Sequence, residues 1–162
     1  MKQLMVQYAA YNVWANQKIL DCIDDLEDEQ IFREISSSHK SIYLTMLQML
    51  DIESIWWQRM KMHEPTHFPS ADFKGSIMEL TKLIIAQSKQ WKEWIDIATD
   101  TILSHEFIYK TNKKDQFKQP VFEALHHLFN QQTFLRGQLT TMLYQSGSTP
   151  PEIDLILFVR KK

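Results

Sequence analysis

The stretch PVFEALHHLFNQQTFLRGQLTTMLYQSG, residues 120–147, decides the fold of this chain. Its apolar side chains recur at helical spacing, which places them on one face of a helix; they are Val121, Leu125, Leu128, Leu135, Leu139 and Met142. Pro120 suits the first helical turn, where a missing N–H costs nothing. Gly147 is well placed as the C-terminal cap, and Pro150-Pro151 prevents resumption. The stretch predicts one long amphipathic helix with a buried face.

Two earlier stretches show the same period. Their apolar positions are Leu4, Tyr8, Tyr11, Ala15, Ile19, Cys22 and Leu26 in the first, and Ile42, Met46, Met49, Ile52, Trp56 and Met60 in the second. The first helix is expected to end near Asp24. The second is expected to follow candidate caps at Ser36-Ser37-Ser38. It should end near His63, because Pro65 lacks an N–H donor and pushes the residue before it out of helical geometry.

A third amphipathic helix is predicted between residues 76 and 99. Ser76 and Glu79 have the spacing of a capping box, which marks its start. The apolar stripe that follows consists of Ile77, Leu80, Ile84, Trp91 and Ile95. We expect this helix to end near Thr99.

Two segments depart from the helical pattern. In residues 100–119, Phe107 and Tyr109 alternate with polar neighbours, and residues 112–115 resemble a turn, so we expect a long connection that contains a hairpin. The tail, residues 155–159, is too apolar to remain in solvent. We expect it to pack against the bundle or against a second subunit.

Composition sets the class of protein. Only three glycines and five prolines interrupt the 162 residues, which favours one all-α domain over residues 1–162. The 18 Lys+Arg and 20 Asp+Glu give a net charge of -2 and are scattered along the chain, so a nucleic-acid or membrane surface is not expected. The single cysteine, Cys22, fits a reducing cytoplasm. No run approaches the ~18 apolar residues of a membrane span.

Histidine spacing gives no complete metal site. His63 and His67 are four residues apart, but Pro65 lies between them. His126 and His127 are adjacent and point about a hundred degrees apart. The unit Glu123-x-x-His126 matches half of a di-iron motif, whose second half would need a helical partner that this sequence lacks. Five tryptophans could form a stacking platform, but their positions along the helical stripes favour core packing; they are Trp14, Trp56, Trp57, Trp91 and Trp94.

One segment inside the last helix is more informative. Residues 130–138 read NQQTFLRGQ, and residues 145–147 read QSG. A glycine inside a helix costs about 1 kcal/mol, so Gly137 predicts a close packing contact or a functional reason. Three further motifs stand in order along the chain, WAN at 14–16, WWQR at 56–59 and PPEID at 150–154. Together they resemble the DinB-like bacterial four-helix-bundle family over nearly the whole chain.

The resemblance implies an up-up-down-down bundle, frequent homodimerisation and, in many members, a divalent metal such as zinc or nickel held by three histidines. One histidine comes from the second helix and two from an Asn-His-x-x-x-His-Arg-Gly-Gln motif in the fourth. In this chain Gln131 and Leu135 stand at the two histidine positions of the fourth helix. Gln48 stands at the histidine position of the second helix. Glutamine binds these metals poorly and leucine offers no donor. We therefore expect a degenerate metal site that binds no metal and no other cofactor.

Two alternatives concern this degenerate site. His127, one turn before Gln131, could join Gln48, Gln131 or Asp51 in a rebuilt metal site. The two glutamines could instead hydrogen-bond to each other, and such a buried pair needs no ligand.

Arg136 could bind an anionic ligand at the cavity mouth, or it could form an ion pair with Asp51 or Glu53. The function that the resemblance favours is a cytoplasmic homodimer that binds a small molecule or a partner without catalysis. The alternative is an enzyme of the family, a thiol-dependent S-transferase or metal-dependent hydrolase, that uses a rebuilt site around His127.

Overall fold

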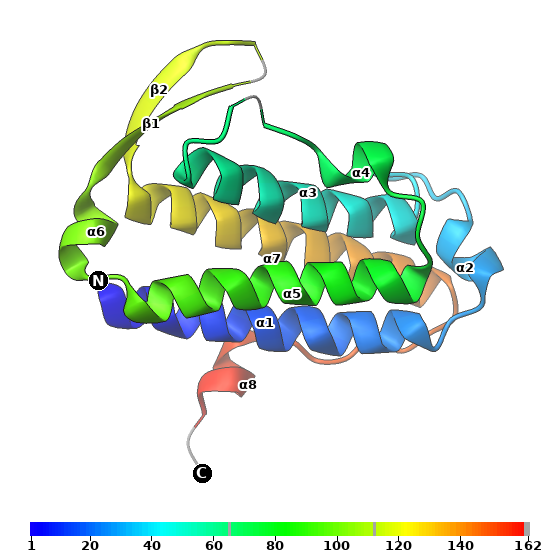
Figure 1. Cartoon of the computed structure of the whole chain (residues 1–162). Coiled ribbons are helices and arrows are strands. Elements are labelled where there is room, and N and C mark those ends of the chain that lie inside the picture. The colour runs from blue at the N-terminus through cyan, green and yellow to red at the C-terminus, as the bar shows by residue number, and fades with distance from the viewer. Residues whose placement is uncertain (65, 112, 161–162) are drawn as a thin grey trace.

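The computed structural model describes residues 1–64, 66–111 and 113–160, and it is mostly helical. Four long helices of this described part lie side by side as a bundle (Figure 1): α1 (Lys2–Asp24), α3 (Ile42–Met60), α5 (Ile77–Ile97) and α7 (Val121–Gln145). The shorter elements lie at the ends and on the outside of the bundle; they are α2 (Asp28–Phe32), α4 (Pro69–Asp72), α6 (Asp100–Ser104), β1 (Glu106–Lys110), β2 (Gln116–Pro120) and α8 (Leu155–Val159). The expectation of a largely α-helical chain is confirmed, with one short hairpin added.

Side-chain contacts fix the direction of two helix pairs. Helices α1 and α5 are antiparallel, because Lys2 at the start of α1 lies beside Asp100, while Asp24 at its end accepts a hydrogen bond from Thr81. Helices α1 and α7 are parallel, since Tyr8 stacks on Phe129 and Cys22 lies against Ser148.

The remaining pairs follow from contacts of α3. It runs antiparallel to α7, because Thr45 contacts Met142 near one end and Trp56 contacts His127 near the other. Since α7 is parallel to α1 and α5 is antiparallel to α1, α3 and α5 are parallel. In chain order the directions are therefore up-down-down-up, and the expected up-up-down-down order is wrong. Among the described connections between the long helices, the one from α3 to α5, with residues 61–64 and 66–76 described, returns along the length of the bundle (Figure 1). This connection can span up to about 50 Å when extended, whereas α5 is about 30 Å long.

The predicted helix boundaries hold to within a few residues. The capping box of α5 is present, because Ser76 accepts from Glu79 N and the Glu79 carboxylate accepts from Ser76 N. Gly147 follows the end of α7 with φ of +83°, which is the left-handed cap that the sequence predicts. The α5 helix ends at Ile97, two residues before the expected Thr99.

Both ends of α3 differ from the prediction. Its N-cap is Ser41, whose hydroxyl accepts from Leu44 N, and not a residue of the Ser36–Ser38 run. Its last residue is Met60, because Met62 turns the chain with φ of +56° while its N–H still bonds to Arg59 O. Pro65, on which the expected end near His63 rested, lies outside the described residues.

The segment between α5 and α7 contains the expected hairpin. After α6, β1 pairs with β2 in antiparallel register, with Glu106 opposite Pro120 and Lys110 opposite Gln116. Asn112, the first residue of the predicted turn, lies outside the described residues. Figure 1 shows the hairpin projecting from one end of the bundle over α3 and the segment that follows it.

The buried stripe of α1 keeps Tyr11, Ala15 and Ile19 of the predicted one, while the adjacent Met5, Ala9 and Ile23 are buried instead of Leu4, Tyr8 and Cys22. Leu4 is 46% exposed, whereas Met5 and Ala9 are buried at the hairpin end of the core and Ile19 and Ile23 at the other. Two asparagines occupy the middle of this stripe. Trp91 is 1% exposed, so core packing is the role of at least this tryptophan.

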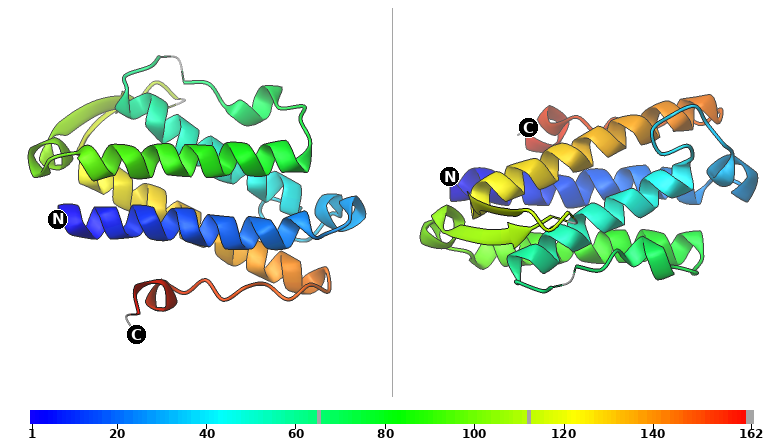
Figure 2. Two further views of the ribbon diagram at one scale, coloured as in Figure 1. Left: turned by 60° about the horizontal axis from the view of Figure 1, so that its bottom comes forward. Right: turned by 90° about the horizontal axis from the view of Figure 1, so that it is seen from above.

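The apolar tail packs on the outside of α1. The Tyr11 hydroxyl donates to Ile153 O at 2.8 Å, and the Phe158 ring lies 6.0 Å from the Tyr11 ring and 5.4 Å from the Trp14 ring. Figure 2 shows the tail returning past α1 from the far end of α7. The first of the two expected locations, against the bundle, is confirmed.

No helix in the described part of the chain combines the length and the apolar character needed to cross a bilayer.

Candidate functional site

A buried polar network joins all four long helices at the middle of the bundle. Arg136 of α7 is 1% exposed, and its Nη1 donates to the Oδ1 atoms of Asn12 and Asn16 on α1, both at 2.7 Å. Its guanidinium also lies over the Tyr11 ring, 5.2 Å from the centroid. Burial lowers the pKa of Arg136, while Tyr11 and Glu53 act in the opposite direction. Arg136 is therefore inside the bundle and not at a cavity mouth.

Glu53 of α3 completes this network. Its Oε1 accepts from Asn12 Nδ2 at 2.8 Å, and Ser88 Oγ of α5 lies within 2.9 Å of both carboxylate oxygens. Glu53 is 1% exposed, and burial raises its pKa to about 7, against the lowering effects of Asn12, Ser88 and Arg136. The hydrogen bonds of Asn12 thus connect Arg136 to Glu53, in place of the expected direct ion pair.

The three positions where the family resemblance places histidines have separate surroundings. Leu135 is 1% exposed and belongs to an apolar cluster with Met49 and Leu139. Gln48 is half-buried and faces a surface hollow of about 400 Å³. Gln131 is half-buried on α7, and no hydrogen bond joins it to Gln48 in the described part of the chain. The neighbouring Gln132 is the fully buried amide, and it donates to Met49 O at 2.9 Å.

His127 and Asp51, the other residues proposed for a rebuilt site, point to different places. Asp51 accepts from Ser70 N at 2.9 Å and from Ser70 Oγ at 2.5 Å beside the Gln48 hollow. His127 packs edge-on against Trp56, with 5.2 Å between ring centroids. Burial and the positive charge of Arg59 lower the pKa of His127. Across the described residues, no three His, Cys, Asp or Glu side chains are grouped closely enough to hold a metal ion.

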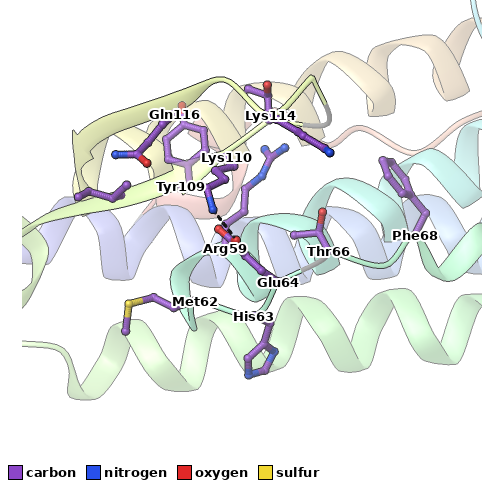
Figure 3. Close-up of a pocket in the computed structure, with 12 residues that line it drawn as sticks. Arg59, Met62, His63, Glu64, Thr66, Phe68, Tyr109, Lys110, Lys114 and Gln116 are labelled. Carbon is purple, nitrogen blue, oxygen red and sulfur yellow. Dashed lines mark hydrogen bonds and ion pairs between the residues drawn. The ribbon is translucent and has the colours of Figure 1, made fainter.

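A pocket lies between the hairpin and the segment that follows α3. We call it the hairpin pocket; its volume is about 1020 Å³. Its polar lining includes Arg59, Glu64, Lys110 and Lys114, and its apolar lining includes Met62, Phe68, Ile108 and Tyr109. Figure 3 shows Arg59 rising from α3 toward the hairpin, with Lys110 and Lys114 extending from the hairpin and His63 pointing away from them. A pocket of this size and mixed lining is typical of a small-molecule site.

Arg59 is held at the floor of this pocket by two aromatic rings. Its guanidinium carbon lies 4.8 Å from the Trp56 ring centroid and 5.3 Å from the Tyr109 ring centroid. Burial lowers its pKa, and Tyr109 acts in the opposite direction. No described residue accepts a hydrogen bond from its buried Nε. The side chain is thus fixed in position by stacking, with donor capacity to spare.

Sequence reasoning offered Glu53 as a partner of Arg136 but missed the asparagines that connect the two, and it missed the hairpin pocket. The network residues Asn12 and Asn16 are four positions apart on the buried face of α1, and this i, i+4 pair of amides was a usable signal. The hairpin pocket gave no signal, because Arg59 and Lys110 come from separate elements, α3 and β1, that meet only where the hairpin folds back over α3.

The fold is that of a small helical-bundle protein: four long helices enclose a buried Asn–Arg–Glu network, and a hairpin covers one end. Comparison with known families shows which family this bundle belongs to. The family model described as "DinB family" matches residues 1–162, so the chain belongs to the DinB family.

Two relatives agree with this assignment. The chain is 29% identical to "Protein DinB" of Bacillus subtilis (strain 168), over 93% of this chain and 92% of that protein. It also resembles the crystal structure of a DinB-like protein from Bacillus cereus ATCC 10987, with a TM-score of 0.73 and 20% identity. That match covers 91% of this chain and 94% of the other, and it supports the fold.

Proposed function

We propose that this chain is a DinB-family protein with a degenerate metal site that acts as a non-catalytic binding protein for a small molecule. The observation that carries the proposal is the environment of Leu135. Its side chain has no donor atom and is buried among other apolar side chains, so it fills the space with packing that a metal ligand would disrupt. The amides at Gln48 and Gln131 are poor ligands for zinc or nickel.

Elemental analysis tests the proposal directly. Untagged protein is incubated with zinc, nickel or manganese, desalted and assayed for metal. We expect well under one ion per chain. A matched variant, Q48H/Q131H/L135H, should gain tight binding of about one ion per chain if these are the former ligand positions. One tightly held ion per chain in the unchanged protein would refute the proposal.

The rival function is a thiol-dependent S-transferase or metal-dependent hydrolase that uses a site rebuilt around His127. The lowered pKa of His127 favours the neutral imidazole, which is the form that binds metals. However, the Arg59 charge that contributes to this lowering would also repel a cation. The rival predicts turnover of a low-molecular-weight thiol with an electrophile, lost in His127→Ala. Absence of turnover in the unchanged protein would remove it.

We also propose that the chain is a single domain that forms a homodimer in the cytoplasm and does not bind nucleic acid. Two exposed aromatic side chains on the outer face of α7, Phe134 at 57% and Tyr144 at 63%, support a self-association surface. Light scattering should give twice the chain mass. A monomeric mass at micromolar concentrations would exclude the dimer.

The absence of nucleic-acid binding is expected because the charges of the chain are scattered and nearly balanced. Salt-sensitive binding to DNA or RNA would contradict this expectation.

A further inference from the structure

We propose that the hairpin pocket binds a small organic carboxylate with an apolar body, and that the carboxylate is held by Arg59 and Lys114. This inference rests on the binding function proposed above and names the class of ligand.

The orientation of Arg59 is the first argument. Trp56 and Tyr109 lie on the same side of the guanidinium, because their ring centroids are 5.0 Å apart and 4.8 and 5.3 Å from its carbon. The two rings fix the position of the guanidinium and leave its N–H groups available for hydrogen bonds. The buried Nε has no acceptor, and no carboxylate lies within ion-pair distance of Arg59 among the described residues. A planar, bidentate acceptor such as a carboxylate complements these N–H groups.

The charge balance of the pocket is the second argument. Lys110 Nζ lies 2.8 Å from the Glu64 carboxylate, so these two charges offset each other. Arg59 and Lys114 then carry two positive charges for which the described part of the chain provides no ion-pair partner. This local excess stands out in a chain whose net charge is -2. It favours an anionic ligand over a neutral or cationic one.

Size and polarity are the third argument. A volume of about 1020 Å³ is larger than an inorganic anion requires. Met62 and Ile108 line this pocket, although they are 79% and 52% exposed, and Phe68 is partly covered. Covering exposed apolar side chains is favourable in proportion to the area removed from water. The ligand is therefore expected to carry an apolar body next to its charged group.

Titration calorimetry with 2-naphthoate tests the proposal. The neutral analogue 2-naphthamide has the same ring and nearly the same shape. We expect saturable binding of one 2-naphthoate per chain. The affinity for 2-naphthamide should be lower by about tenfold or more, which is the loss in affinity expected when a hydrogen bond to a charged group is removed. Arg59→Gln should weaken 2-naphthoate by a similar factor and leave 2-naphthamide nearly unchanged. Lys89→Gln, which removes an exposed charge on α5, is the matched control.

Two further variants keep the test valid if Arg59→Gln fails to fold. Lys114→Gln should weaken 2-naphthoate several-fold. Glu64→Gln should strengthen it several-fold, because Lys110 is then released from its ion pair. Circular dichroism verifies that each variant is folded.

Three outcomes would overturn the proposal. These are no saturable 2-naphthoate binding, equal affinity for the amide, or an affinity unaffected by all three pocket variants. Tighter binding of 2-naphthyl phosphate than of 2-naphthoate would replace the carboxylate with a phosphate ester. Metal analysis is independent of these results: a metal-loaded chain that binds 2-naphthoate through Arg59 would refute the metal-free proposal alone.

Discussion

Substitution of Glu53 by glutamine should change how the stability of the protein depends on pH. Glu53 has a pKa of about 7 in the folded protein, against 4.5 for an unperturbed glutamate, and burial is the largest cause. Between these two values the folded chain binds more protons than the unfolded chain, so the free energy of unfolding falls as pH rises. At about 1.4 kcal/mol per pKa unit, the contribution of Glu53 that is lost between pH 4.5 and 7 is about 3 kcal/mol.

Glutamine has nearly the same shape as the protonated glutamate and does not titrate. Its Oε1 can still accept the hydrogen bonds from Asn12 and Ser88. The two proteins should therefore have similar stability near pH 4.5. Above pH 7, Glu53→Gln should be more stable than the unchanged protein by up to about 3 kcal/mol.

Urea denaturation followed by circular dichroism, repeated from pH 4.5 to pH 8, measures this difference. Taking the difference between the two proteins cancels the titration of every other group. Glu93→Gln is the control, because Glu93 is exposed on α5. If the stability difference between Glu53→Gln and the unchanged protein stays constant within about 0.5 kcal/mol over this range, the reasoning about Glu53 is refuted.

Three other substitutions test the packing. Gly137→Ala should raise the free energy of unfolding by about 1 kcal/mol, because a Cβ there meets no atom within 4 Å; a lower melting temperature would contradict this. Leu135→Ala should lower the free energy of unfolding by about 2–5 kcal/mol in urea denaturation, because it opens a cavity in the core, and a loss below about 1 kcal/mol would mean that the site is loosely packed. Tyr11→Phe removes the hydrogen bond to Ile153 O. It should cost about 1 kcal/mol and speed proteolysis within residues 148–160, and an unchanged cleavage rate would show that the aromatic contacts alone hold the tail.

The open space around Gly137 corrects one sequence prediction. A glycine in a helix interior predicts a close packing contact or a functional reason, and the first of these is wrong here, because Gly137 is exposed on α7. Helical periodicity places Gly137 on the outer side of α7, between the exposed Phe134 and Thr141. No contact among the described residues explains the glycine.

Local sequence determined the helices and most of their ends. The three-and-four spacing of apolar residues identified α1, α3, α5 and α7, because that spacing is what a helix with one buried face requires. The Ser76–Glu79 box and Gly147 marked helix ends through interactions within one or two turns. Motifs spread along the chain were also enough to identify the DinB family.

The tertiary structure alone decided which faces meet. Asn12, Glu53 and Arg136 interrupt three apolar stripes, and their partners come from helices more than 40 positions away in the chain. The order of helix directions and the hairpin pocket depend in turn on the path of residues 61–76 across the bundle. Periodicity specifies the buried face of each helix, but the neighbour of that face follows from long-range packing that no local pattern encodes.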